Sequence, residues 1–176
     1  MGRRVTLTAP VALSDPHDCA QFESGVTTLN DWLKRRARAN QASGASRTFV
    51  ICEGARVVGY FALAAGSVVI AAAPGRFRRN MPEPIPVAVL GRLAVDRARQ
   101  GQGLGRAMFR NAALRVLNAA ESIGIRGVLV HAISTEARAF YLALGFDPSP
   151  LDEMTLMAAM GDVEASAAQV KAKPRR

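Results

Sequence analysis

Three glycines within five residues separate an apolar segment from a long stretch of helical periodicity, and this arrangement constrains the fold most. Gly101, Gly103 and Gly105 follow the apolar segment 87–95, and the stretch behind them contains no proline before about Gly124. A glycine-rich turn between a buried strand and a helix lets backbone N–H groups converge at the start of the helix, where the helix dipole adds partial positive charge. The sequence therefore predicts a pyrophosphate-binding loop in an α/β chain, with a plain glycine-rich turn as the alternative.

The remaining chain predicts one mixed α/β domain. Its 176 residues are the usual length of a single domain. Thr28 is expected to cap the first helix, and Gly145 to close the last one. Residues 1–160 are expected to form the domain, and residues 161–176 a weakly packed basic tail. The expected strands span 5–9, 48–53, 57–70, 87–95, 128–132 and 154–160, and the expected helices begin at 28, near 104 and at 135.

Charge points to an acidic partner. Lys and Arg number 23 against 14 Asp and Glu, which gives a net charge of +9 and a pI near 10.9. Such a balance favours nucleic acid, an anionic cofactor or a membrane surface as partner, although a solvated arginine-rich surface would give the same count. No apolar run reaches the roughly 18 residues of a membrane span, so no transmembrane segment is expected. A membrane is not expected among the partners.

The two cysteines indicate the compartment. Cys19 and Cys52 have no spacing typical of a zinc site, so no metal is expected. We interpret both as reduced thiols of a cytoplasmic protein. A reactive cysteine paired with His17 or His131 stays open as an alternative.

The glycine loop fits one known phosphate-binding pattern. A P-loop would need Lys-Ser or Lys-Thr, and the dinucleotide fingerprint would need a glycine where Arg106 stands. The pattern [Q/R]-x-x-G-x-[G/A] fits Gln100, Gly103 and Gly105. Downstream, Ala139-Phe-Tyr-x-x-x-Gly-Phe146 follows the strand that contains His131. With these motifs, residues 48–160 resemble the GNAT acetyltransferases.

The resemblance implies the GNAT acyl-CoA N-acyltransferase fold, in which helices flank a mixed central sheet, and acetyl-CoA as the cofactor. Tyr141 matches the tyrosine that protonates the departing thiolate; as a phenol it is protonated at neutral pH, although it could instead be a core aromatic. His131 is expected to be a core or orienting residue rather than a base. The residues implied to hold acetyl-CoA are Leu93, Ala94, Val95, Arg99, Gln100, Gly101, Gln102, Gly103, Leu104, Gly105, Arg106 and Phe140.

The flanking segments narrow the resemblance to the GNAT toxins of toxin–antitoxin systems (the TacT, KacT and AtaT group). Residues 22–33, 36–41, 46–50, 90–95 and 130–132 are similar to that group, which extends the resemblance over residues 5–160. Ser24 departs from it, because those toxins often carry Cys there; no functional loss is expected. The resemblance implies acetylation of the α-amine of aminoacyl-tRNA, a block of translation, a ribbon-helix-helix antitoxin and a homodimer.

The basic residues agree with a tRNA substrate, because contacts to phosphate come chiefly from Lys and Arg. Arg92 is the sharpest candidate, since it interrupts an apolar strand; a structural ion pair is its alternative. Two other functions stay open: a GNAT enzyme that acetylates a small amine or a protein amine, and a non-catalytic nucleic-acid-binding module. The candidates for tRNA contacts are Lys34, Arg35, Arg36, Arg38, Arg78, Arg79 and Arg92.

Overall fold

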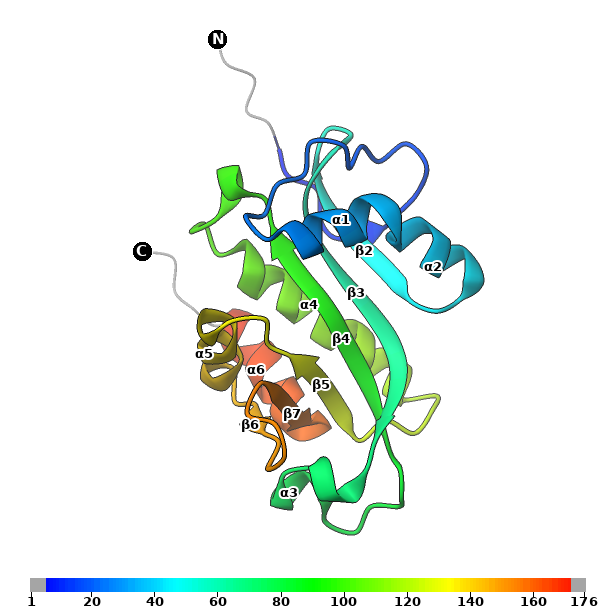
Figure 1. The fold of residues 1–176 in the computed structure, drawn as a ribbon, viewed down its shortest axis with the longest axis vertical. Helices are drawn as coiled ribbons and strands as arrows, with labels where there is room; N and C mark the ends of the chain where they lie inside the picture. The colour runs from blue at the N-terminus through cyan, green and yellow to red at the C-terminus, as the bar shows by residue number, and fades with distance from the viewer. Residues whose placement is uncertain (1–5, 172–176) are drawn as a thin grey trace. The chain divides into compact units, whose positions relative to one another are not determined.

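The computed structural model describes residues 6–171. Within that range, seven strands form one mixed sheet in the order β1-β2-β3-β4-β5-β7-β6 (Figure 1). The contacts divide the chain into two units, Met1–Ala64 with Arg92–Phe109, and Ala65–Gly91 with Arg110–Arg176. Strands β3 (Arg56–Val68) and β4 (Ile85–Val95) and helix α4 (Leu104–Ala120) each contribute residues to both units. The predicted fold class, a mixed α/β sheet with helices, is confirmed.

The first unit is built on an antiparallel hairpin. Strand β2 (Arg47–Glu53) is rich in residues that favour strands, and it pairs with β3 after a turn at Gly54, whose φ is +58°. The short strand β1 (Val11–Ala12) pairs with β2. The strand expected over residues 5–9 is wrong in extent, because only Leu7 forms an isolated bridge there and residues 1–5 lie outside the described range.

The helix expected from Thr28 is instead two helices. Helix α1 (Thr27–Arg35) begins one residue earlier, with Val26 in the N-cap position and no side-chain cap, so the prediction that Thr28 caps it is wrong. Arg36 leaves helical geometry, and α2 (Ala37–Ser43) follows and ends at Gly44, whose φ is +81°. Leu29, Leu33 and Ala37, which repeat at helical spacing in the sequence, are buried in the core of this unit.

The second unit contains the parallel pair. Residues 88–90 of β4 pair in parallel with 128–130 of β5 (Gly127–His131), and β5 pairs antiparallel with β7 (Thr155–Ala159). Helix α5 (Thr135–Ala143) is capped by the Ser134 hydroxyl, which accepts from the amide of Ala137. Short elements complete the chain: the 3-10 helices Ile70–Ala72 in this unit and Arg97–Arg99 in the first, α3 (Gly75–Arg78) and β6 (Asp147–Pro148).

Most of the expected tail is helical. Helix α6 (Met160–Lys171) buries Val163, Ser166 and Ala167, so it packs rather than frays. Residues 172–176 of the predicted tail lie outside the described residues. Among the described helices, none combines the length and the apolar character that crossing a membrane would require.

Candidate functional site: a glycine loop at the start of a helix

The loop from Gly101 to Arg106 exposes a row of backbone amides at the start of α4. Gly101 and Gly103 have φ values of +77° and +81°, a conformation that side-chain-bearing residues rarely adopt. A Cβ atom added at either glycine would meet nothing within 4 Å, so the space above the loop is open. Within the described residues, the amides of Gly101–Arg106 donate to no protein group. Unpartnered donors at the positive end of a 17-residue helix fit a pyrophosphate.

The beginning of this loop is anchored by the side chain of Gln100. Its Nε2 donates to the carbonyl oxygen of Ser24 at 2.8 Å and to that of Val95 at 3.0 Å. Asp96 adds two contacts, because its carboxylate accepts from the amides of Glu23 and Ala98. The Gln100 side chain therefore holds the loop to the end of β4 and to the turn before α1, which the sequence pattern alone did not reveal.

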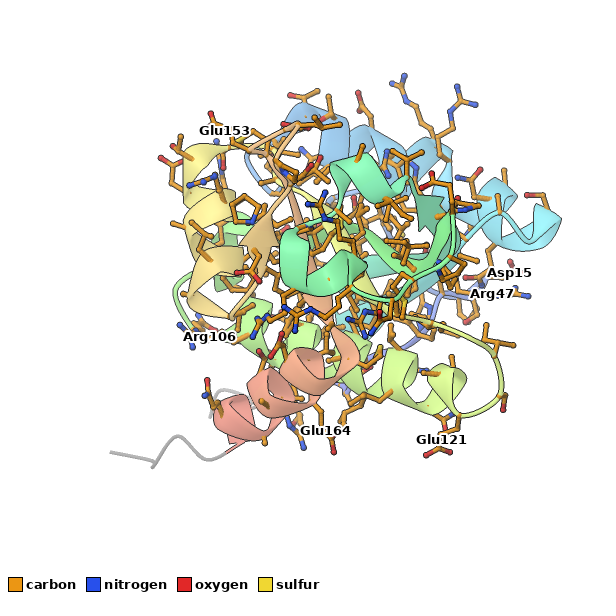
Figure 2. The ribbon with its side chains drawn as sticks, turned by 90° about the horizontal axis from the view of Figure 1, so that it is seen from below. Asp15, Arg47, Arg106, Glu121, Glu153 and Glu164 are labelled. Atoms are coloured by element: carbon orange, nitrogen blue, oxygen red, sulfur yellow. The ribbon has the colours of Figure 1, made fainter. Side chains whose placement is uncertain are left out.

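The two arginines beside the loop differ. Arg99 forms an ion pair with Glu53, so its charge is compensated and its expected role toward phosphate is weakened. Arg106 is exposed and projects outward (Figure 2). The sequence could not distinguish them, because Glu53 lies on a distant strand.

The strand residues expected to contact the cofactor lie just before the loop, at the end of β4. Leu93 and Val95 are half-buried, whereas Ala94 is buried in the core of the first unit. Their backbone is held in place by Asp96, whose amide donates to the carbonyl of Val58 at 2.8 Å.

The predicted proton donor, Tyr141, lies on α5 in an aromatic cluster of the second unit. Phe140 meets it edge-on with ring centroids 5.2 Å apart, and Phe146 lies 5.5 Å away. The residue is only 7% exposed, and burial raises the pKa of its hydroxyl well above the usual value of about 10. The phenol therefore keeps its proton at neutral pH. Within the described residues its hydroxyl has no hydrogen-bond partner.

The other tyrosine of the chain cannot play this part. Tyr60 is 0% exposed, and its hydroxyl donates to the carbonyl of Leu29 at 2.6 Å. Its hydroxyl is thus committed to holding α1 against β3. Of the two tyrosines in the sequence, Tyr141 alone has a hydroxyl available for chemistry.

His131 is placed differently from the expectation of a core histidine. It is exposed at the last position of β5, and its Nδ1 lies 2.9 Å from the hydroxyl of Thr155. That hydroxyl in turn donates to Asp152 at 2.8 Å. The three residues line a hollow of about 310 Å³ in the second unit. The contact with Thr155 orients the imidazole ring.

The cationic candidates of the first unit differ in their exposure and in their contacts. Lys34, Arg35 and Arg36 lie at the end of α1, and within the described residues none of their side chains forms a hydrogen bond or an ion pair. Arg38 instead donates to the carbonyl of His17 at 2.5 Å, so it supports the loop before α1. Arg92 is half-buried with its guanidinium 4.6 Å from the ring centre of Trp32. This contact replaces the ion pair that we considered.

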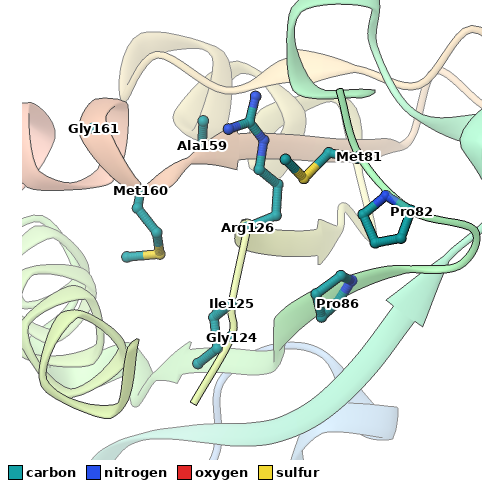
Figure 3. Close-up of a pocket in the computed structure, with 9 residues that line it drawn as sticks. All are labelled: Met81, Pro82, Pro86, Gly124, Ile125, Arg126, Ala159, Met160 and Gly161. Atoms are coloured by element: carbon teal, nitrogen blue, oxygen red, sulfur yellow. The ribbon is translucent and has the colours of Figure 1, made fainter. Parts of the chain in front are cut away.

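Arg78 and Arg79 of the second unit are exposed at the end of α3. Nearby, a hollow of about 360 Å³ is lined mainly by apolar side chains around Arg126 (Figure 3). The Arg126 guanidinium donates to the carbonyls of Phe77 and Arg76, so Nε and Nη2 are engaged within the protein. Among the described residues, no three His, Cys, Asp or Glu side chains gather as a metal site.

Comparisons with known proteins agree with this geometry. Residues 44–148 match the acetyltransferase (GNAT) domain. A tRNA-acetylating toxin of Mycobacterium tuberculosis (strain ATCC 25618 / H37Rv) is 53% identical over 90% of this chain and 95% of its own. Sinorhizobium fredii (strain NBRC 101917 / NGR234) has a probable toxin TacT that is 30% identical over 76% of this chain and 80% of its own.

Solved structures give the same result. The toxin AtaT complexed with acetyl-methionyl-tRNAfMet has a TM-score of 0.83 and 30% identity, over 91% of this chain and 98% of its own. A mutant of AtaT bound to the C-terminus of the antitoxin AtaR and acetyl-CoA has a TM-score of 0.78 and 28% identity, over 91% and 97%. The chain belongs to the GNAT acetyltransferase family and, within it, to the group of tRNA-acetylating toxins.

Proposed function

We propose that this chain is an acetyl-CoA-dependent N-acetyltransferase toxin that acetylates the α-amine of aminoacyl-tRNA and so blocks translation. The observation that carries the enzymatic part is the row of unpartnered amides of Gly101–Arg106 at the start of α4. The 53% identity to a tRNA-acetylating toxin supports the substrate.

The chain's own groups divide the work of holding acetyl-CoA. The amides of Gly101–Arg106 hold the pyrophosphate, and the exposed Arg106 adds charge beside it. The backbone of Leu93–Val95 binds the pantetheine amides, and Phe140 contributes an apolar wall. Gln100 and Arg99 act indirectly, since both side chains are engaged with other parts of the first unit.

The reaction needs a neutral amine, an electrophilic carbonyl and a proton for the leaving sulfur. Bound acetyl-CoA supplies a thioester whose carbonyl carbon accepts an amine. The new C–N bond forms as the C–S bond breaks, and Tyr141 donates its phenolic proton to the departing sulfur. An α-amine has a pKa of about 8, so a minor but sufficient fraction of it is neutral at physiological pH and can pass its proton to water without a strong base.

The substrate-binding side is carried by cations. Lys34, Arg35 and Arg36 are exposed together at the end of α1, with Arg92 on β4 of the same unit. Arg78 and Arg79 contribute from the second unit, and Arg38 supports the loop beside α1. Their charges suit the phosphates of an RNA acceptor, whereas a cationic amine substrate would require an acidic groove.

The partners of the toxin follow from the same group of proteins. A ribbon-helix-helix antitoxin neutralises it, a homodimer is its working form, and the cytoplasm is its compartment, where tRNA is charged. The structure of AtaT with the C-terminus of AtaR supports an antitoxin partner.

Transfer of labelled acetyl from acetyl-CoA to charged and to uncharged tRNA tests the proposal. Label is expected only on charged tRNA, because uncharged tRNA has no α-amine. Label on protein amines without label on charged tRNA would favour a protein acetyltransferase instead. Binding of tRNA without any acetyl-CoA turnover would indicate a non-catalytic binding module.

A further inference from the structure

Three flat side chains from three elements meet in the first unit. Trp32 of α1 stacks on Tyr60 of β3, with ring centroids 5.9 Å apart and planes 10° from parallel. Arg92 of β4 lies over the same indole, with its Cζ 4.6 Å from the ring centre. A guanidinium over an indole face is attracted by the electron-rich ring.

The base of this stack is rigid. Tyr60 is fully buried, and its hydroxyl donates to Leu29, one turn before Trp32 in the same helix. Phe22 packs edge-on against Tyr60 at 5.4 Å. The indole is therefore fixed in position, and the guanidinium of Arg92 lies over it.

Arg92 differs from several other arginines of this unit in its contacts. Arg56 and Arg99 form ion pairs with Asp96 and Glu53, and Arg38 donates to backbone carbonyls. For Arg92, no side-chain hydrogen bond or ion pair is found within the described residues; its guanidinium lies over Trp32, and the residue is half-buried. Its N–H donors are thus available to a ligand, while the indole holds the guanidinium in place.

We propose that Arg92 and Trp32 form a platform on which an unpaired nucleobase at the 3′ end of the RNA substrate stacks. Arg92 contacts the base, and Trp32 is the positioning residue that orients it. Unpaired bases expose their faces and stack on aromatic rings or guanidinium planes, whereas bases inside a duplex cannot. The inference rests on the proposed function, since the aminoacyl group is attached to such an unpaired 3′ nucleotide.

The position of the platform agrees with this role. Arg92 immediately precedes Leu93–Val95, the strand segment assigned to pantetheine, and Trp32 precedes the exposed cations Lys34–Arg36 in α1. A base held at the platform therefore lies beside the assigned acetyl-CoA contacts, while phosphates on its 5′ side meet the cations.

Binding of uncharged tRNA tests the platform without catalysis. Wild-type protein should bind intact tRNA more tightly than tRNA from which the unpaired 3′ nucleotides have been removed. Stacking on one residue corresponds to a loss of roughly 5- to 150-fold in affinity when it is abolished. Because the chain has a single tryptophan, Trp32, its emission reports on the platform directly and should change only with intact tRNA.

Arg92→Lys is the decisive variant, because it keeps the charge and removes the plane. It should lose the preference for intact tRNA while the salt dependence of binding stays as in wild type. Trp32→Phe, which keeps a smaller ring, should retain part of the preference that Trp32→Leu loses. Arg47→Lys is the matched control, since Arg47 is exposed and donates to the carbonyl of Gln41 rather than stacking on a ring.

Two results overturn the platform. One is an Arg92→Lys variant that discriminates intact from truncated tRNA as wild type does, which would assign Arg92 to a phosphate. The other is a wild-type protein that binds both RNAs equally. If wild type acetylates charged tRNA while either result holds, the proposed function stands and the platform fails. If it acetylates no tRNA, the proposed function fails, and the binding comparison still decides the platform.

Discussion

Replacing Tyr141 by Phe should remove catalysis and leave folding intact. The substitution keeps the ring and its contacts with Phe140 and Phe146, and it deletes one oxygen that has no protein partner within the described residues. Loss of a proton donor lowers a rate by roughly 100- to 10,000-fold. Since no hydrogen bond within the described part is lost, the free energy of unfolding should change by less than about 0.5 kcal/mol.

Tyr60→Phe provides the matched control, because it deletes the same oxygen from the other tyrosine. There the hydroxyl donates to Leu29 at 2.6 Å in a fully buried position. The lost hydrogen bond should cost about 1–2 kcal/mol. For a chain of this length the melting temperature should fall by roughly 2–8 °C.

The assays are single-turnover transfer of acetyl to charged tRNA, calorimetric binding of acetyl-CoA and thermal unfolding. Tyr141→Phe should bind acetyl-CoA as wild type does and melt at the same temperature, but transfer acetyl slowly. A transfer rate equal to that of wild type would refute the assignment of Tyr141 as donor. A melting temperature lowered as in Tyr60→Phe would show that its hydroxyl is structural.

Three further perturbations test other parts of the site. Gly103→Val should abolish acetyl-CoA binding in a calorimetric titration, whereas Gly44→Val, at a glycine with the same φ of +81° and equally open surroundings, should carry the same backbone strain and still bind. Replacing Lys34, Arg35 and Arg36 together by alanine should weaken tRNA binding and reduce the slope of log K against log salt concentration by roughly 2–3. An unchanged slope in filter binding would exclude phosphate contacts of these three residues. Burial raises the pKa of Tyr60 and Tyr141, so above pH of about 10 the unfolded chain loses protons that the folded chain keeps, and denaturant titrations should show stability falling as pH rises.

The sequence predicted what depends on local pattern. The glycine spacing after an apolar strand identified the loop at the start of α4, because positive φ and open space there require residues without side chains. The hairpin at Gly54 and the helix closed by Gly145 followed from the same kind of local signal. The motif around Tyr141 placed that tyrosine on a helix, as the structure has it.

What the sequence missed depends on partners far along the chain. Arg99 and Arg38 were grouped with free cations, yet Glu53 and the carbonyl of His17 engage them. Local pattern also failed at Thr28, because α1 begins without a side-chain cap and relies on its buried apolar face instead. Trp32 falls in the apolar repeat of its helix, and nothing in the sequence shows that it meets an arginine on a strand 60 residues later.

The two carbonyl groups beside Gln100 explain which residues the first position of the loop pattern accepts. In both of its side-chain hydrogen bonds Gln100 is the donor, and the acceptors are the carbonyl oxygens of Ser24 and Val95. The side-chain oxygen of Gln100 takes part in neither bond. This position therefore requires a long side chain that ends in N–H donors, and an amide group is not itself needed. Arginine meets the same requirement, which explains why the pattern tolerates arginine in place of glutamine. Glutamate, identical in outline, would set lone pairs against two carbonyl oxygens and is incompatible with the pattern for that reason. The glutamine of this phosphate-binding pattern thus anchors the loop to the rest of the unit.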